Sequence, residues 1–180
     1  MFRIATPADA SAIASLHTIN WQRSYRGAMT DHYLDTVAPT ERLEVWTQRL
    51  NQPNARLQVA LAEAEDGTLM GFSCVFPHHS AVDGHLLDNL HVHPDFRRLG
   101  LGKKLMRHSA QWLLDTGHQG EIYLWVLTSN LSAIRFYEIM RGRAGRIENH
   151  TFAGDQTTEA MMMSWELTEL ATDIEKEVGH

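Results

Sequence analysis

The sequence predicts one domain of the α/β (α+β) class, with helices flanking a mixed central sheet. Two observations favour this class. Strand-like and helix-like segments alternate along the chain, and two strand–helix units follow each other in its second half. The chain has 180 residues, of which 43% are hydrophobic and 21% charged, as expected of a single globular domain.

The N-terminal third predicts one strand and three helices. Thr6 is a candidate N-cap, and Pro7 suits the first position of a helix. Gly27 interrupts the helical pattern, and Thr40 is a candidate cap for a later helix. The expected elements are a strand over residues 2–5, a helix from about Pro7 to Tyr25, a short helix over residues 30–37 and a longer one over residues 39–51.

The middle of the chain predicts three strands, over residues 55–63, 69–77 and 85–94. The turn residues 65–68 make the first two strands a hairpin, and Pro94 ends the third.

The second half alternates helix and strand. Residues 100–117 show one apolar side at helical spacing, with Gly117 as the expected C-cap. The apolar run over residues 121–128 predicts a strand that is buried on both faces. A helix over residues 130–142 and two closing strands around a Gly154–Asp155 turn follow, and residues 168–180 are expected to form a polar tail.

Composition and charge argue against several classes of protein. The formal net charge of -6 and the pI near 6.0 do not favour general nucleic-acid binding. The N-terminus lacks a basic region followed by an apolar run, and no 18 consecutive residues are apolar, so neither a secretory signal nor a membrane span is expected. Cys74 is the one cysteine, which excludes a disulfide within the chain and favours a reducing, cytoplasmic location.

A basic stretch with two glycines, HVHPDFRRLGLGKKLM over residues 91–106, stands out in this acidic chain. It fails the Walker A pattern, because a lysine follows Lys103, and it fails the dinucleotide fingerprint, because Leu105 stands where the third glycine belongs. A strand end, a glycine turn and a helix start explain the stretch better. Glycines let a ligand approach closely, and a helix N-terminus offers unpaired N–H groups to an anion. With Arg97 and Arg98 adding charge, the stretch predicts a pyrophosphate cradle.

Two other interpretations of this stretch are disfavoured. His91 and His93 share a strand face, and three more histidines are close in sequence, but no cysteine pair or His-Glu-x-x-His spacing accompanies them, so no metal site is predicted. Phe96 is the one aromatic residue among the cations, so nucleic-acid contact is not predicted either.

Motifs in and around the stretch point to a family. The spacing [Q/R]-x-x-G-x-[G/A] is filled by Arg97, Gly100 and Gly102, and L-x-V-x-P-x-[FY]-R stands directly upstream. A second strand–helix unit supplies Asn130, Ala133, Phe136 and Tyr137. Together these features resemble the GCN5-related N-acetyltransferase (GNAT) family, although Arg98 stands where many members have glycine. The resemblance runs from Phe2 to about Leu167, so residues 1–167 are predicted to form a single acetyltransferase domain.

The resemblance implies a fold and a cosubstrate. The expected sheet is GNAT-like, mixed and twisted, and its two central parallel strands splay apart around acetyl-CoA, the acyl donor. Main-chain groups of the first strand would bind the pantetheine arm, and amides of the glycine turn would hold the pyrophosphate. The residues expected to bind the cofactor are Leu90, Val92, Arg97, Arg98, Leu99, Gly100, Leu101, Gly102, Lys103, Asn130, Ala133 and Tyr137.

The resemblance also implies direct transfer of the acetyl group to a primary amine in a ternary complex, without a protein nucleophile. Tyr137 is the predicted general acid for the leaving thiolate. Asp88 is the first candidate for the general base, and His91 and Glu121 are alternatives between which the sequence does not decide.

The acceptor amine, either a small molecule or a peptide, is expected beside the first helices. Trp21, Tyr25 and His91 are the candidate substrate-binding residues, and Cys74 is expected to pack in the core. No nucleic-acid or membrane partner is expected, and a homodimer is open because members of the family are often dimers. A non-catalytic acyl-CoA-binding sensor of the same fold and an enzyme for longer acyl groups are the alternative functions.

Overall fold

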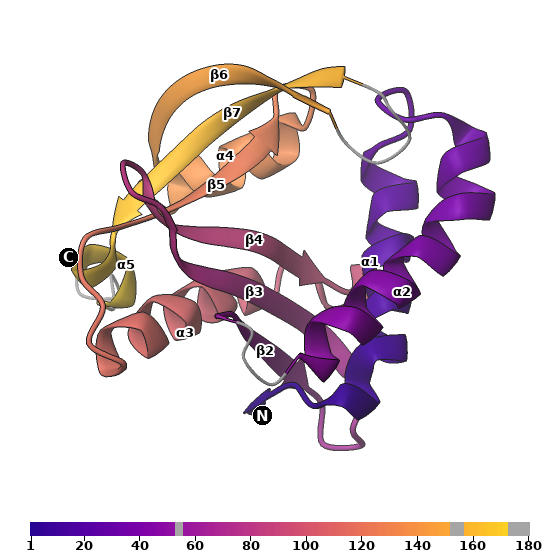
Figure 1. The fold of residues 1–180 in the computed structure, drawn as a ribbon, viewed down its shortest axis with the longest axis horizontal. Helices are drawn as coiled ribbons and strands as arrows, with labels where there is room; N and C mark the ends of the chain where they lie inside the picture. The colour runs from indigo at the N-terminus through magenta and orange to yellow at the C-terminus, as the bar shows by residue number, and fades with distance from the viewer. Residues whose placement is uncertain (53–55, 152–156, 173–180) are drawn as a thin grey trace.

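The computed structural model describes residues 1–52, 56–151 and 157–172. They form one seven-stranded sheet in the order β1-β2-β3-β4-β5-β7-β6, with helices on both faces (Figure 1). Neighbouring strands are antiparallel except β4 and β5, which are parallel. The mixed, helix-flanked sheet predicted from the sequence is confirmed.

The N-terminal segment follows the prediction. β1 (Phe2–Ile4) leads into a 3₁₀ turn (Pro7–Asp9) and then α1 (Ala10–Ser24). The Asp9 carboxylate accepts hydrogen bonds from the backbone N–H and the hydroxyl of Thr6, at 2.7 and 2.9 Å, and also binds Arg3. This reciprocal contact fixes the start of the helix where Thr6 and Pro7 indicated it.

The next two predicted helices are in fact one, so the prediction of a separate helix capped by Thr40 is wrong. Residues 31 and 32 are helical, a wide π-helical turn covers Tyr33–Val37, and α2 (Ala38–Asn51) continues it. Pro39 has no N–H to donate to the carbonyl four residues earlier. The helix widens instead of ending, and the Ala38 N–H bonds the Tyr33 carbonyl five residues back.

The first half of the sheet is an antiparallel meander. β2 (Gln58–Glu63) and β3 (Leu69–Ser80) form the predicted hairpin, and β4 (Gly84–Val92) returns beside β3. Between β3 and β4 the register shifts by one residue, because Cys74 faces Asn89 while Val75 faces Leu87. Asp88 is therefore the extra residue of a β-bulge.

The second half supplies the remaining elements. They are α3 (Leu101–Asp115), β5 (Glu121–Leu127), α4 (Leu131–Ile139), β6 (Arg143–Thr151), β7 (Thr157–Glu166) and α5 (Leu167–Ala171). Gly117 ends α3 with a left-handed backbone, as predicted, and five of the seven residues of β5 are buried. The predicted Gly154–Asp155 turn lies outside the described residues.

The two central strands separate along their length. In the described chain β4 and β5 pair at two positions, His85 with Ile122 and Leu86 with Tyr123. Beyond these pairs each strand keeps its antiparallel partner on the other side, and the two diverge (Figure 1). The predicted splay of the central strands is confirmed.

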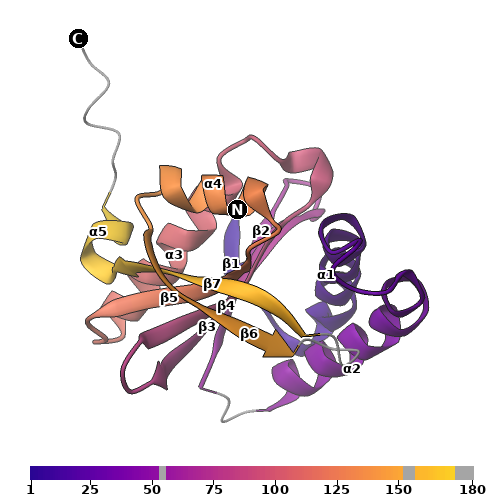
Figure 2. The ribbon, with the colours of Figure 1, turned by 90° about the horizontal axis from the view of Figure 1, so that it is seen from above.

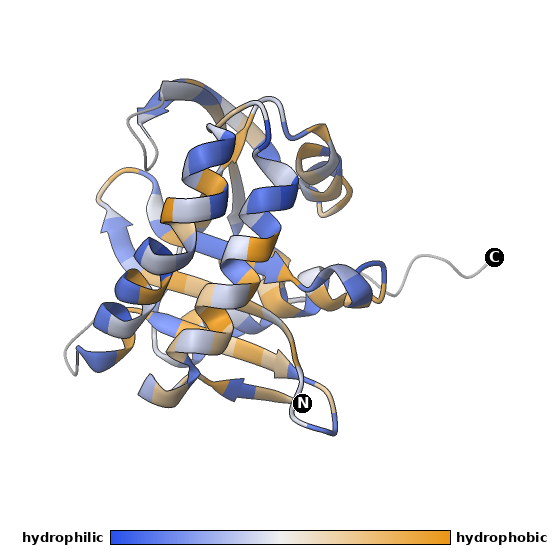
Figure 3. Cartoon of the chain, turned by 90° about the vertical axis from the view of Figure 1, so that its right-hand side faces the viewer, coloured by the Kyte–Doolittle hydropathy of each residue, from blue (hydrophilic) through white to orange (hydrophobic). Residues whose placement is uncertain are grey.

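Two apolar clusters cover the two faces of the sheet. Helices α1 and α2 bury Ile13 and Trp46 against β2 and β3, and α3, α4 and α5 bury a second set that includes Met106, Tyr137 and Leu170 (Figure 2). Helices α1 and α2 mix hydrophilic and hydrophobic residues, as amphipathic helices do (Figure 3).

The described start of the predicted polar tail belongs to the packed domain. Helix α5 lies against α3, and Leu170 is buried in the same cluster as Leu167. The alternation of apolar and polar residues over this short turn is too brief to be recognised as a helix from the sequence. None of the described helices is both long and apolar enough to cross a membrane.

The closed end of the β4–β5 pair gives a test of the fold. An added Cβ at Gly84 would lie 2.3 Å from the Glu121 carbonyl oxygen, whereas one at Gly67 would meet nothing within 4 Å, and both glycines have positive φ, +89° and +85°. We expect Gly67→Ala to cost ~1–2 kcal/mol for backbone strain alone. Gly84→Ala should cost at least ~1 kcal/mol more, because the strands must move apart. Urea denaturation measures both, and equal losses would contradict the close approach.

Candidate active site

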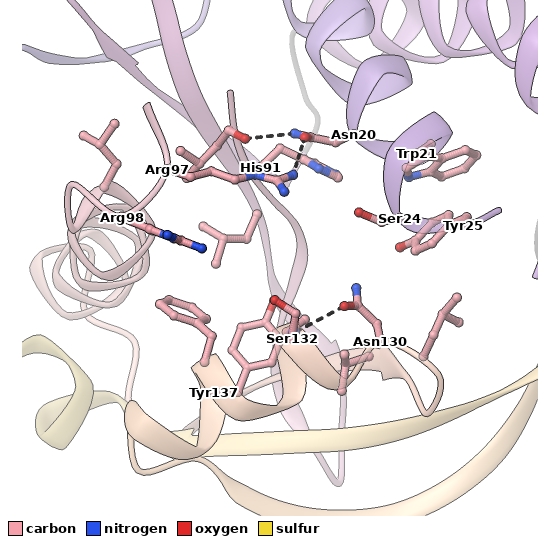
Figure 4. A pocket seen from close by; sticks show the side chains of 18 of the residues that line it. Asn20, Trp21, Ser24, Tyr25, His91, Arg97, Arg98, Asn130, Ser132 and Tyr137 are labelled. Atoms are coloured by element: carbon pink, nitrogen blue, oxygen red, sulfur yellow. Dashed lines mark hydrogen bonds between the residues drawn. The ribbon is translucent and has the colours of Figure 1, made fainter. Parts of the chain in front are cut away.

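A cavity of about 560 Å³ opens where β4 and β5 separate. Residues of β4 and β5 line its centre, α1 contributes one wall, and the starts of α3 and α4 contribute the other (Figure 4). Its volume suits an elongated small-molecule ligand. The predicted site residues that line it are Trp21, Tyr25, Leu90, His91, Val92, Arg97, Arg98, Gly100, Leu101, Gly102, Asn130, Ala133 and Tyr137.

The glycine turn at one end of the cavity has the backbone of an anion site. Gly100 caps α3 with φ +74°, and the first helical bond runs from the Lys104 N–H to the Gly100 carbonyl at 3.1 Å. The amides before Lys104 therefore have no carbonyl within the helix to bond. At Gly102 a Cβ would lie 3.2 Å from the Phe136 ring, so glycine keeps α3 and α4 close.

The backbone of Arg98 lies in the left-handed region, with φ +65°. This conformation is unfavourable in free energy for any residue that has a Cβ atom. This backbone explains why glycine is the common residue at that position of the motif. Its side chain extends toward the cavity from the turn (Figure 4), so the strained position presents a cation to any bound anion.

Asn20 of α1 ties the turn to the end of β4. Its side-chain amide donates to the Val92 carbonyl at 3.2 Å, and its oxygen accepts from Arg97 Nη2 at 2.8 Å (Figure 4). Asn20 is buried, so both contacts form away from bulk water. They hold the Arg97 guanidinium beside the cavity. Sequence reasoning missed this residue, because a single asparagine on an amphipathic helix carries no motif.

Asn130 caps α4 at the opposite wall. Its Oδ1 accepts from the Ala133 N–H at 3.2 Å, which satisfies one of the free amides of the helix. Its side-chain nitrogen points into the cavity (Figure 4) and can donate to a ligand there. The spacing of Asn130 and Ala133 thus serves the helix as well as the site.

Tyr137 projects from α4 into the cavity and is 9% exposed. Its ring packs edge-on against Phe136 and Trp165. Burial, together with the neighbouring Tyr25 hydroxyl, raises the pKa of Tyr137 well above its ordinary value. The hydroxyl is therefore protonated at neutral pH and available as a proton donor.

Comparison with known proteins decides the family. Residues 13–142 match the model of the acetyltransferase (GNAT) family. The chain belongs to this family.

Individual relatives agree. The chain is 26% identical over 166 residues to the uncharacterized N-acetyltransferase YuaI of Bacillus subtilis, covering 91% of this chain and 92% of that protein. It is 36% identical over 152 residues to a streptothricin acetyltransferase of Streptomyces lavendulae, covering 77% and 79%. Its fold matches the PaiA N-acetyltransferase of Thermoplasma acidophilum in complex with coenzyme A, with a TM-score of 0.69, 20% identity and coverage of 92% and 98%. Acetyl-CoA is the cosubstrate of the GNAT family.

Four of the predicted candidate residues do not line the cavity of this GNAT chain. Leu99 is 63% exposed at the tip of the turn, and Lys103 lies one residue beyond the part of α3 that faces the cavity. Asp88 sits at the β-bulge, where Arg49 Nη1 donates to its carboxylate at 2.7 Å. Glu121, the third candidate base, lies at the closed end of β5 and pairs with Arg143 at 2.7 Å.

His91 lies against the buried His17, with ring centroids 4.5 Å apart. Burial and the nearby Arg97 lower the pKa of His91 to about 3. Burial likewise lowers the pKa of His17, whose Nδ1 accepts from Trp46 Nε1 at 3.0 Å. His91 is neutral at neutral pH and lines the cavity, where it can contact a ligand.

Trp21 and Tyr25 line the cavity and also pack with Met29, Tyr33 and Leu34 in a small apolar cluster. Burial and the charge of Asp88 raise the pKa of Tyr25 to about 12. Both aromatic residues therefore combine a packing role with a place in the wall.

Other residues of the wall were not predicted as site residues. They come from four different elements and are Asn20, Ser24, Phe96, Trp125, Val126, Leu127, Ser132 and Phe136. Phe96 and Phe136 belong to the family motifs but were not assigned to the site, and the others carry no motif. Cys74 is fully buried in the cluster under α1 and α2, which confirms its predicted packing role, and burial raises the pKa of its thiol.

The strained backbone at Arg98 yields a prediction on stability. Glycine adopts positive φ without a steric penalty, so Arg98→Gly should be ~0.5–1 kcal/mol more stable than Arg98→Ala. At Arg97, where φ is −67°, Arg97→Ala should instead be more stable than Arg97→Gly. Urea denaturation of the four variants measures their free energies of unfolding. If Arg98→Ala were more stable than Arg98→Gly, the result would contradict the left-handed backbone at this position.

The low pKa of His91 yields a prediction on pH. The unfolded chain binds a proton near pH 6.5 that the folded chain refuses until about pH 3, so stability is lost as the pH falls through this window. His91 contributes up to ~1.4 kcal/mol per pH unit to this loss. We expect His91→Gln to lose stability less steeply between pH 6 and 4 in urea denaturation, and equal slopes would contradict an imidazole that stays neutral in the folded chain.

Proposed function

We propose that this protein is an acetyl-CoA-dependent N-acetyltransferase that acetylates a primary amine by direct attack in a ternary complex. The cavity between the splayed strands carries this proposal. It joins an anion cradle at the start of α3 to a buried, protonated tyrosine and an aromatic wall on α1. These are the parts that an acyl-CoA and an amine need together.

Acetyl-CoA would lie along the gap between β4 and β5. Its pyrophosphate would bind the amides at the start of α3 with Arg97 and Arg98, which line that end of the cavity. Main-chain groups of Leu90 and Val92 would bind the pantetheine arm, because β4 has no strand partner on this side of the gap among the described residues. Asn130 would donate to the arm from the opposite wall.

Chemistry follows at the inner end of the gap. The neutral amine attacks the thioester carbon, a C–N bond forms, and the C–S bond breaks. The leaving thiolate takes the proton of the Tyr137 hydroxyl, which burial keeps protonated.

We propose that Asp88 is the general base, which accepts the proton of the acceptor amine through a water molecule. Asp88 stands at the bulge of β4, outside the cavity wall, and its charge reaches Tyr25 inside the wall. Because Asp88 does not line the cavity, we propose that a water molecule carries the proton to it. His91, which lines the cavity, stays the alternative base, and Glu121 lies at the closed end of the strand pair.

We propose a small-molecule amine as the acceptor, bound by Trp21, Tyr25 and His91. The 36% identity to a streptothricin acetyltransferase over most of both chains supports this substrate class. The single, buried Cys74 suits a reducing compartment, and we place the enzyme in the cytoplasm.

A thiol-release screen with acetyl-CoA and a panel of primary amines tests the function. The panel contains small-molecule amines, amino acids, polyamines and lysine peptides. We expect at least one small-molecule amine to accelerate thiol release, and acetyl-CoA alone to raise the melting temperature. Stabilisation without acceleration by any amine would favour the non-catalytic acyl-CoA sensor.

Tyr137→Phe tests the acid. Removal of the hydroxyl should lower kcat by roughly 10²–10⁴-fold and leave the melting-temperature shift by acetyl-CoA unchanged. The control is Tyr123→Phe, because the Tyr123 hydroxyl bonds His79 Nδ1 at 2.7 Å outside the cavity, and its kcat should stay near that of the wild type. An unchanged kcat in Tyr137→Phe would show that another group, or water, protonates the thiolate.

A further inference from the structure

Three histidines from three segments converge at the closed end of the β4–β5 pair, away from the cavity. His78 lies near the end of β3, His85 is the second residue of β4, and His118 follows α3. One ring nitrogen of each lies within 4.8 Å of one from each of the others. We propose that His78, His85 and His118 form a binding site for Zn²⁺.

Hydrogen bonds orient the buried member of the cluster. His85 Nε2 faces the Gln119 carbonyl at 3.1 Å, and a carbonyl can only accept, so Nε2 carries the ring proton. Zinc-binding histidines characteristically donate their second ring nitrogen to a carbonyl in this way. The lone pair is then on Nδ1, where it accepts from the His78 backbone N–H at 3.0 Å. A cation would replace that N–H as the partner of Nδ1.

The other two rings already face each other through ring nitrogens. His118 Nδ1 and His78 Nε2 are 3.0 Å apart, so one proton lies between two nitrogen atoms. Two ligands of one tetrahedral Zn²⁺, each about 2.0–2.1 Å from the metal, lie only slightly further apart than this. A Zn²⁺ ion in place of the shared proton needs only a small outward movement of the two rings.

The backbone at His78 is held in an uncommon conformation. Its φ is +50°, within the irregular part of β3 where the register with β4 shifts between Phe76 and Ser80. A left-handed residue of this type costs free energy and persists where surrounding contacts require it. Here the conformation turns the His78 ring toward His85 and His118, with ring centroids 4.9 and 4.7 Å apart.

The chemistry of the cluster selects the metal. Three imidazole nitrogens suit Zn²⁺ among the abundant divalent ions, whereas Mg²⁺ and Ca²⁺ prefer oxygen ligands. His78 is exposed, so a water molecule can complete the tetrahedron. The sequence predicted no metal site because the spacing is not a known motif: His118 lies 40 residues after His78 and meets it only through the fold.

A zinc ion at this position would stabilise the end of the sheet at which β4 and β5 are paired. His85 pairs with Ile122 in one of the two contacts that join β4 to β5, and His118 follows the end of α3. The ion would tie the β3–β4 hairpin to the turn after α3. The site is independent of the proposed acetyl transfer.

Zinc binding to the full-length chain tests the proposal. Protein stripped with a chelator and dialysed is titrated with ZnCl₂ by calorimetry, and melting is followed with and without Zn²⁺. We expect one Zn²⁺ per chain and a higher melting temperature in its presence. Cobalt substituted for zinc should give visible absorption bands of a tetrahedral, nitrogen-ligated ion.

Matched variants locate the ion. His78→Gln and His118→Gln remove ligands that are not fully buried, and each should weaken binding by roughly tenfold or more. The control is His32→Gln, an exposed histidine outside the cluster that contacts Thr36, and its zinc affinity should equal that of the wild type. The proposal is overturned if the wild type shows no 1:1 binding, or if both ligand variants bind as tightly as the control.

Discussion

The active-site cavity depends on one restriction, the short length of the parallel pairing between β4 and β5. Two residue pairs join the strands, His85 with Ile122 and Leu86 with Tyr123, and Gly84 permits the close approach at that end. Further along, the edge of β4 that faces the gap has main-chain groups without a strand partner among the described residues. Such groups cost free energy if they stay unpaired. A ligand with amide groups of its own, such as a pantetheine arm, satisfies them better than an apolar molecule would.

The same divergence brings two helix starts to one edge of the sheet. Helices α3 and α4 follow β4 and β5 in sequence, so Gly100 and Asn130 cap them at the open end of the gap. Helix N-termini carry partial positive charge and favour anions and polar acceptors. Both walls therefore present a favourable electrostatic environment to an anionic cofactor. The inner part is apolar and buried, which keeps Tyr137 protonated and His91 neutral. One geometric feature thus creates both the end of the cavity that we propose binds the pyrophosphate and the end at which we propose the reaction occurs.

Local signals in the sequence were enough for most of the fold and for more than half of the residues that line the cavity. Caps and turns such as Thr6 and Gly117, and the short motif around Gly100, act within a few residues of themselves, so their pattern is visible without coordinates. The sequence did not predict the continuous helix through Pro39. A proline can either end a helix or widen its preceding turn, and the sequence does not show which of the two occurs. Asn20 was missed for a different reason: its partners, Val92 and Arg97, lie more than seventy residues away and meet it only after folding.

The protonation states of Tyr137, His91 and the acceptor amine link the geometry to the proposed reaction. Near neutral pH the proposed acid, Tyr137, holds its proton and His91 holds none, so neither group titrates there. The limiting proton is then the one on the acceptor amine, which must leave before the amine can attack. Asp88, the proposed base, pairs with Arg49 and does not line the cavity, so we expect it to receive that proton without setting the amount of free amine at low pH. The pH at which turnover rises should therefore follow the basicity of the amine, which makes the acceptor, rather than the enzyme, the main source of pH dependence.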